Sequence, residues 1–158
     1  MNSKGLAKAI LLLFVGISVV VLLAQEFSKP EAPPPAAEAN AVMAEGGSRV
    51  VLYYFHTTYR CPSCRQMEAL AQDAIQREFR RELDEGRLLW VPVNLEEGGN
   101  NRFIREYQLY TRSLVLVRIR NGRQAEWKNL RNAWVVLNDE AAFRSYVEAE
   151  VRAYFEAS

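Results

Sequence analysis

Cysteine and histidine are scarce in this chain of 158 residues, which has two cysteines and one histidine. The cysteines form a single Cys-x-x-Cys motif, whereas a closed zinc site usually needs four ligands. No glycine-rich phosphate-binding turn follows a strand-like segment, so we expect no flavin, nicotinamide or other cofactor. The formal net charge is only +1, and we therefore expect no nucleic-acid partner.

Long apolar runs are also few, and the main one lies near the N-terminus. Residues 1–8 form a basic N-terminus with Lys4 and Lys8, and the run that follows has no charge as far as Ala24. Its length approaches the ~20 residues of a bilayer-spanning helix. The run lacks a small-x-small cleavage site and has no cysteine to carry a lipid. We interpret residues 9–25 as an uncleaved transmembrane signal-anchor, with a cleaved signal peptide as the alternative.

Positively charged flanks of a membrane span tend to stay in the cytoplasm, so we expect the basic N-terminus to be cytoplasmic and the rest of the chain to be exported. The expected location is the inner membrane, crossed once, with the C-terminal domain in the periplasm. Residues 26–48 are rich in proline and alanine and cannot form a core, so they are predicted to be a linker. A leader without a spacing role fits them equally well. Residues 49–158 form the predicted folded domain, in a compartment where disulfides persist.

The folded part alternates between strand-like and helix-like patterns. Nearly continuous runs of β-branched and aromatic residues predict buried strands, and apolar side chains three or four residues apart predict helices. The predicted strands cover residues 49–56, 88–94, 114–120 and 123–128. The predicted helices cover residues 62–84, 102–107 and 139–155. Residues 130–137 fit neither pattern.

Local signals define how these elements connect. Pro62 suits the first turn of a helix, and Pro92 places its strand at a sheet edge or a bulge. Asn121-Gly122 predicts a tight hairpin between the last two strands. The first two strands need a crossover and are therefore parallel. The resulting β-α-β-α-β-β-α order with a mixed sheet is a thioredoxin-like α/β arrangement.

The Cys-x-x-Cys motif follows the first strand and opens the first long helix. There the helix dipole favours a thiolate, and the pKa of Cys61 can fall from ~8.5 toward 7. This placement favours thiol–disulfide exchange, in which Cys61 attacks and the more buried Cys64 resolves the mixed disulfide. Arg60 and Arg65 flank the pair and either favour the thiolate or are ordinary solvated arginines. Pro62 and Ser63, between the cysteines, tune the redox potential.

Two other interpretations of the cysteines remain. A structural disulfide is less favoured, because closing a loop of about four residues contributes roughly 2 kcal/mol at best. Binding of a thiophilic metal or metalloid is the stronger alternative, because soft sulfur ligands suit Cu(I). His56 and Met67 lie close enough in sequence to add a third ligand. A histidine at a strand end is more often packed or solvated, and Met67 falls on the apolar helix face.

Three segments resemble the thioredoxin-like ArsF family, also called nitrophenyl compound nitroreductase subunit. They are residues 51–75, which include the cysteines, residues 91–97 and residues 107–130. The resemblance covers most of residues 49–158. It implies an exported or anchored thioredoxin-like protein with a link to nitroaromatic reduction. It leaves open a non-catalytic subunit of a nitroreductase-type complex.

The chain departs from ordinary thioredoxins at three places. The dipeptide between the cysteines is Pro62-Ser63 rather than Gly-Pro. Phe55 stands where thioredoxins have a buried acid, which makes His56 a candidate general base. The cis-proline expected before the third strand is absent, and Thr111-Arg112-Ser113-Leu114 stands in its place. These departures predict an altered substrate groove.

The sequence as a whole predicts a membrane-anchored, extracytoplasmic thiol–disulfide oxidoreductase. Its expected partner is a protein that supplies or accepts thiols or a disulfide, and anchoring suggests a membrane electron carrier. Cys61 and Cys64 are the predicted reactive residues.

Overall fold

The computed structural model describes residues 47–156, and the statements below concern that range. The predicted signal-anchor at residues 9–25 and nearly all of the predicted linker lie outside the described residues. Within residues 47–156, no helix combines the length and the apolar character needed to cross a bilayer.

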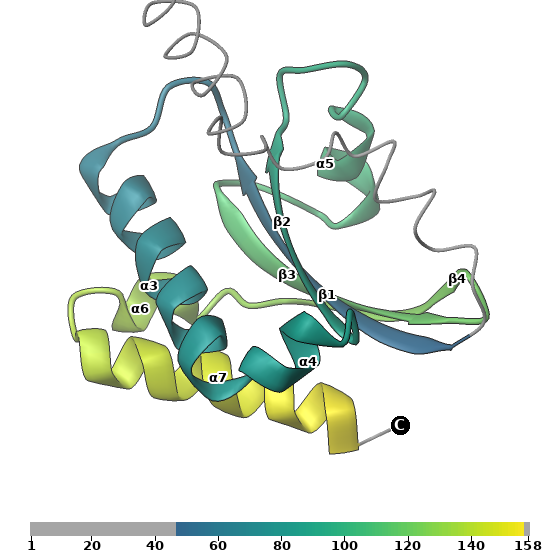
Figure 1. Ribbon diagram of the computed structural model, residues 1–158. Coiled ribbons are helices and arrows are strands. Elements are labelled where there is room, and N and C mark those ends of the chain that lie inside the picture. Colours follow the sequence, from purple (N-terminus) through teal and green to yellow (C-terminus); the bar gives the residue numbers. More distant parts are fainter. Residues whose placement is uncertain (1–46, 157–158) are drawn as a thin grey trace, which may run out of the picture. The chain divides into compact units, whose positions relative to one another are not determined.

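Four strands form one mixed sheet in the order β2-β1-β3-β4 (Figure 1). The strands are β1 Ser48–His56, β2 Leu88–Asn94, β3 Ser113–Arg120 and β4 Arg123–Asn129. β1 and β2 are parallel, whereas β1 pairs with β3, and β3 with β4, in antiparallel fashion. This order and these directions confirm the predicted thioredoxin-like arrangement.

β1 lies inside the sheet, which explains its nearly continuous apolar sequence. Its residues from Val50 to His56 are all buried. β2 occupies one edge, where Pro92 pairs in register with Tyr54. Because proline has no N–H to donate, it is tolerated at an edge, and the predicted edge position of this strand is confirmed. β4 occupies the other edge and is mostly exposed.

The turn between β3 and β4 is the predicted hairpin at Asn121-Gly122. Both residues have positive φ, 52° for Asn121 and 71° for Gly122. A two-residue turn with positive φ at both positions matches the right-handed twist of the strands that it joins. Asparagine and glycine adopt such a backbone most readily, which is why the dipeptide predicted the turn.

Five helices complete the described part of the chain. They are α3 Pro62–Glu78, α4 Arg80–Asp84, α5 Arg102–Glu106, α6 Ala133–Val136 and α7 Glu140–Glu156. The prediction of one continuous helix over residues 62–84 is wrong, because the backbone breaks at Phe79 (φ −121°, ψ 31°). The Phe79 ring is buried there and stacks on Phe155 of α7, 6.1 Å away. The unassigned residues 130–137 contain α6.

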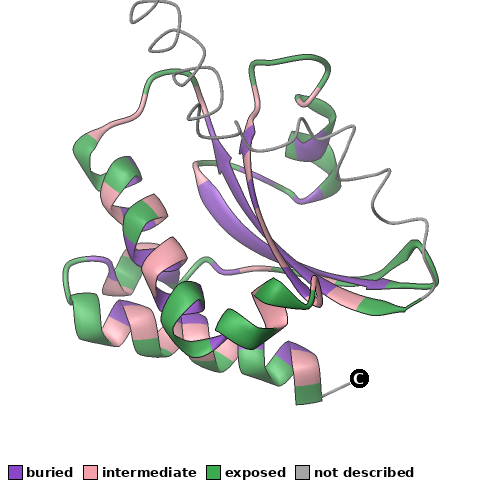
Figure 2. Ribbon diagram, viewed as in Figure 1, coloured by how far each residue is buried: buried purple, intermediate pink, exposed green. Residues whose placement is uncertain are grey.

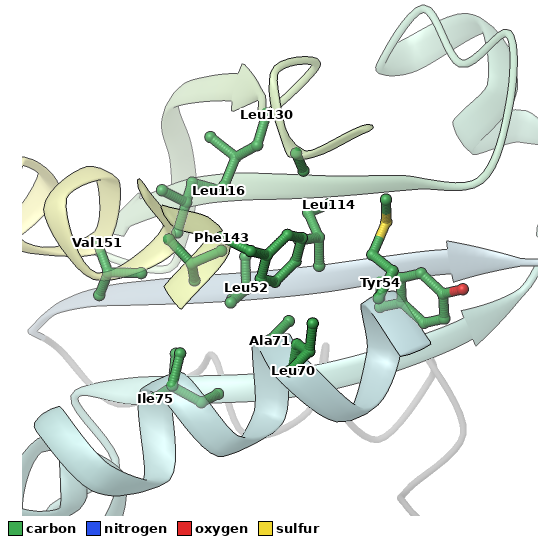
Figure 3. Packing of buried hydrophobic residues seen from close by; sticks show 14 of the residues in the cluster. Leu52, Tyr54, Leu70, Ala71, Ile75, Leu114, Leu116, Leu130, Phe143 and Val151 are labelled. Atoms are coloured by element: carbon green, nitrogen blue, oxygen red, sulfur yellow. The ribbon is translucent and has the colours of Figure 1, made fainter. Parts of the chain in front are cut away.

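The two faces of the sheet bury different sets of side chains, because successive residues of β1 point in opposite directions. Val50, Leu52 and Tyr54 face α3 and α7 and share a core with Phe143 and others (Figure 3). Val51, Tyr53 and Phe55 belong to a second cluster that includes Phe103 of α5. Figure 2 shows that β1 and β3 are largely buried, whereas β4 and the outer surfaces of the helices are exposed. The face of β1 that carries Tyr54 is therefore the face covered by α3.

Candidate redox site

A short loop leads from the carboxyl end of β1 into α3, and Cys61 is the residue that caps this helix. The Cys61 backbone is extended (φ −66°, ψ 162°), and its Sγ accepts a hydrogen bond from the Cys64 N–H at 3.2 Å. Pro62 occupies the first turn, where its missing N–H leaves no gap in the helix. The local sequence therefore fixes the first cysteine at the helix N-terminus.

Cys61 and Cys64 form a disulfide, with their Cα atoms 5.0 Å apart. The two sulfurs are not equivalent. Cys61 is partly exposed, whereas Cys64 has an exposed fraction of 1% and faces the core. An incoming thiolate or disulfide therefore meets Cys61 first, and Cys64 is reached through Cys61.

The N-terminal end of α3 favours negative charge on the exposed sulfur. The first turn of α3 contains no acidic residue to oppose the positive end of the helix dipole. Pro62 and Ser63 are both exposed. Arg65 is also exposed, and no ion pair links it to another described residue. Once reduced, Cys61 lies where a thiolate is stabilised.

Tyr54 holds the second cysteine against the sheet. Its buried hydroxyl donates to the Cys64 carbonyl oxygen at 2.7 Å, and its ring stacks on Trp90 with 6.2 Å between centroids. Burial raises the pKa of Tyr54 to about 12; the Glu68 carboxylate adds to this, and Arg60 and Arg112 oppose it. Tyr54 was not among the residues predicted from the sequence. The alternation of side chains between the two faces of β1 could have identified it, because this alternation turns Tyr54 toward α3 and Phe55 away from α3.

His56, Arg60 and Glu68 form a continuous polar chain beside the cysteines. His56 is buried, and its Nδ1 lies 3.0 Å from the Thr57 carbonyl, which can only accept, so Nδ1 carries the hydrogen. The His56 Nε2 then accepts from Arg60 Nη2 at 2.7 Å. Arg60 Nη1 pairs with Glu68 at 2.5 Å. Sequence reasoning singled out His56 and Arg60, but not Glu68.

This arrangement changes what His56 can do. Both of its ring nitrogens have partners, so it accepts a proton only after Arg60 moves away from Nε2. The same contacts keep His56 from acting as a third metal ligand, and Met67 is fully buried in the core. Among residues 47–156, no group of three or more histidine, cysteine or acidic side chains is placed to hold a metal ion. The described site thus offers two sulfur ligands, Cys61 and Cys64.

The loop before β3 lies against the loop that leads to Cys61. Arg112 Nη2 donates to Thr57 Oγ1 at 2.8 Å, and the Arg112 carbonyl accepts from Trp134 Nε1 at 2.8 Å. A surface pocket of about 360 Å³ opens along this loop. Its lining residues are Tyr110, Thr111, Ser113, Asn129, Leu130, Arg131 and Trp134. The segment that replaces the expected cis-proline is thus held by an arginine and bordered by a pocket with aromatic walls.

Comparisons with known proteins give distant likenesses. No family model matches the chain, and no curated protein matches it. Among solved structures, a thioredoxin-like protein from Edwardsiella tarda is 20% identical, with a TM-score of 0.41, over 61% of this chain and 82% of that chain. Mitochondrial thioredoxin 3 from Saccharomyces cerevisiae, in its oxidised form, is 12% identical, with a TM-score of 0.42, over 73% and 90%. A thioredoxin variant from Halobacterium salinarum is 20% identical, with a TM-score of 0.42, over 72% and 82%. The thioredoxin-like fold is assigned from the strand order and connections described above.

Proposed function

We propose that residues 49–158 act as a thiol–disulfide oxidoreductase whose reactive pair is Cys61 and Cys64. The observation that carries this proposal is the disulfide at the N-terminus of α3, directly after β1 of the mixed sheet. The exposed sulfur caps the helix, and the buried sulfur lies one turn inside it. A disulfide placed for stability alone has no need of this asymmetry, and its small loop stabilises little.

The geometry supports a two-step exchange. In the reduced protein the Cys61 thiolate attacks one sulfur of a partner's disulfide; a Cys61–partner disulfide forms, and the partner's other sulfur leaves as a thiolate. Cys64 then gives its proton to the thiolate that the partner released in the first step, and the Cys64 thiolate attacks the Cys61 sulfur. The mixed disulfide breaks, the second partner sulfur leaves, and the Cys61–Cys64 disulfide is restored. Two electrons pass from this protein to the partner, and the reverse sequence oxidises a partner dithiol.

A trapping experiment tests the exchange. Cys64→Ser leaves Cys61 without its resolving thiol, so a covalent adduct with a disulfide-bearing partner accumulates and is released by a reductant. The matched control is Cys61→Ser, which keeps only the buried sulfur and forms no adduct. If Cys64→Ser captures no partner and the reduced wild type instead binds a thiophilic ion stoichiometrically, the exchange mechanism is wrong.

The finer proposal concerns topology. Residues 9–25 anchor the protein in the inner membrane, and the linker at residues 26–48 holds the domain on the periplasmic side. The support is the uncharged run preceded by Lys4 and Lys8. N-terminal sequencing of the mature protein is expected to begin at Met1. A start near residue 25 would make the domain a free exported protein.

Membership of the ArsF family is also part of the proposal, on the resemblance of residues 51–75, 91–97 and 107–130. In that setting the domain passes electrons between a membrane electron carrier and a periplasmic client. The competing role is a non-catalytic subunit. That role predicts full activity of the host complex when Cys61 and Cys64 are both replaced by serine, whereas the exchange role predicts its loss.

A further inference from the structure

Next to the cysteines in the chain, Arg60 and Glu68 form an ion pair. The Arg60 guanidinium donates through Nη1 to Glu68 and through Nη2 to His56. The side chains of Arg60 and Glu68 have exposed fractions of 33% and 20%. Because the pair is partly removed from water, its electrostatic effect is screened less than that of a surface pair.

The pair lies alongside the dithiol. Arg60 directly precedes Cys61 in the chain, and Glu68 lies one helical turn beyond Cys64, on the same side of α3. The Arg60–Glu68 contact thus spans the turn of α3 that contains both cysteines. A change in either charge therefore alters the electrostatic environment of that turn.

We propose that Glu68 is a positioning residue that sets the redox potential of the Cys61–Cys64 pair, because it holds Arg60 in a neutral pair and withholds the guanidinium charge from the Cys61 thiolate. The inference deepens the proposed function and rests on it. An uncompensated arginine beside a cysteine favours the thiolate, and a stabilised reduced form makes the dithiol a stronger oxidant. His56 keeps the guanidinium in place from the sheet side.

Other charged groups around the site do not duplicate this role. Arg112 has a counter-charge in Glu96, which accepts from the Thr58 N–H at 3.0 Å and whose pKa is lowered, first by its hydrogen bonds to Thr58 and then by Arg112. Arg65 is exposed, so solvent screens it. His56 and Tyr54 of β1 are neutral titratable groups on the sheet side of the site, and Tyr59 in the loop before Cys61 is exposed. Arg60 is thus the partly buried cation whose effect depends on Glu68.

The test uses full-length, reduced protein, and ultraviolet absorbance of the thiolate against pH as the readout. Glu68→Gln leaves Arg60 uncompensated, so the pKa of Cys61 falls and the thiolate fraction below that pKa rises about three- to tenfold. Arg60→Gln leaves Glu68 uncompensated and shifts the pKa upward. The double variant returns to within a factor of about two of wild type. Equilibration of each protein with glutathione then measures the redox potential of the Cys61–Cys64 pair. We expect the potential of Glu68→Gln to be higher than that of wild type by at most about 30 mV.

Glu78→Gln is the matched control, because Glu78 ends the same helix and pairs with Arg152, far from the cysteines. A merely structural role for Glu68 would not move the thiol pKa in opposite directions in the two single variants. The inference is overturned if Glu68→Gln shifts the pKa no more than Glu78→Gln does, or shifts it upward.

The two proposals fail separately. Opposite pKa shifts without a trapped partner for Cys64→Ser would retain the electrostatic role and reject the exchange function. A trapped partner without opposite pKa shifts would retain the function and reject the role of Glu68.

Discussion

The Tyr54 hydroxyl donates to the main-chain oxygen of Cys64, and this buried contact joins the middle of the sheet to the first turn of α3. The buried cysteine therefore has its backbone fixed by the sheet, while Cys61 lies at the open end of the same turn. The Cys61 sulfur, which bonds in turn to a partner and to Cys64, is thus paired with a cysteine whose backbone is held fixed.

Replacing Tyr54 by phenylalanine is expected to lower the free energy of unfolding by about 1–2 kcal/mol, because the buried Cys64 carbonyl loses a hydrogen bond while the ring packing remains. Urea unfolding of the oxidised protein measures the change. Tyr110→Phe is the control, since Tyr110 is 88% exposed and its change should stay within about 0.5 kcal/mol. Equal effects of the two substitutions would contradict a stabilising role for the Tyr54 contact.

Alkaline pH is expected to destabilise the domain. Burial, the largest cause in each case, raises the pKa of Tyr53, Tyr54 and Tyr154 to about 12. Tyrosine in an unfolded chain has a pKa of about 10, so folding favours the neutral phenol. The stability linked to each group is complete below about pH 10 and is lost as the pH rises toward 12, by as much as ~2–3 kcal/mol per tyrosine.

Urea unfolding between pH 8 and 11, together with tyrosinate absorbance, checks this dependence. The Tyr54→Phe protein should lose less stability over the same range, since one of the shifted groups is absent. Titration of all seven tyrosines of the folded protein at an ordinary pKa would show that the prediction is wrong.

Phe143→Ala is expected to destabilise the domain by about 3–5 kcal/mol, because the fully buried ring fills the core between α7 and the sheet and its loss leaves a cavity. Thermal unfolding gives the measurement. Val135→Ala is a fitting control, because this apolar side chain is exposed. A similar loss for both would mean that α7 is not packed on the sheet as described.

Arg65→Gln is expected to raise the pKa of Cys61 in the reduced protein by only about 0.3, since the arginine is exposed and unpaired among the described residues. The shift should disappear in about 1 M salt, where exposed charges are screened. A larger part of the Cys61 pKa shift caused by Arg60→Gln should remain in about 1 M salt, because the Arg60 side chain is partly buried. A salt-independent effect of Arg65 would place it closer to the sulfur than its exposure indicates.

The sequence predicted the features that depend on local chemistry. Asn121-Gly122 marked the hairpin because few residues accept positive φ at two successive positions. Pro92 marked the sheet edge because it lacks an N–H. Pro62 and the cysteine spacing located the start of α3, and the order of apolar runs then determined the sheet.

Contacts between segments that are distant in the sequence could not be predicted from local patterns. The break at Phe79 occurs because its ring packs on Phe155, which the pattern of residues 62–84 cannot reveal. The pairing of Arg60 with Glu68 likewise depends on how the loop after β1 folds along α3. Side-chain partners of this kind are decided by packing, so the candidate site was located by its cysteines while its electrostatic surroundings were not.

The two edges of the sheet have a consequence for how the protein behaves at high local concentration. Pro92 of the edge strand β2 has no N–H to donate, and β4 presents the charged side chains of Arg123, Glu126 and Lys128 along its exposed length. Such edges resist pairing with a strand of another copy, which is the usual route to aggregation of β-rich domains. We therefore expect copies of the domain to stay separate at high local concentration, which leaves the helix end that carries the partly exposed Cys61 sulfur accessible.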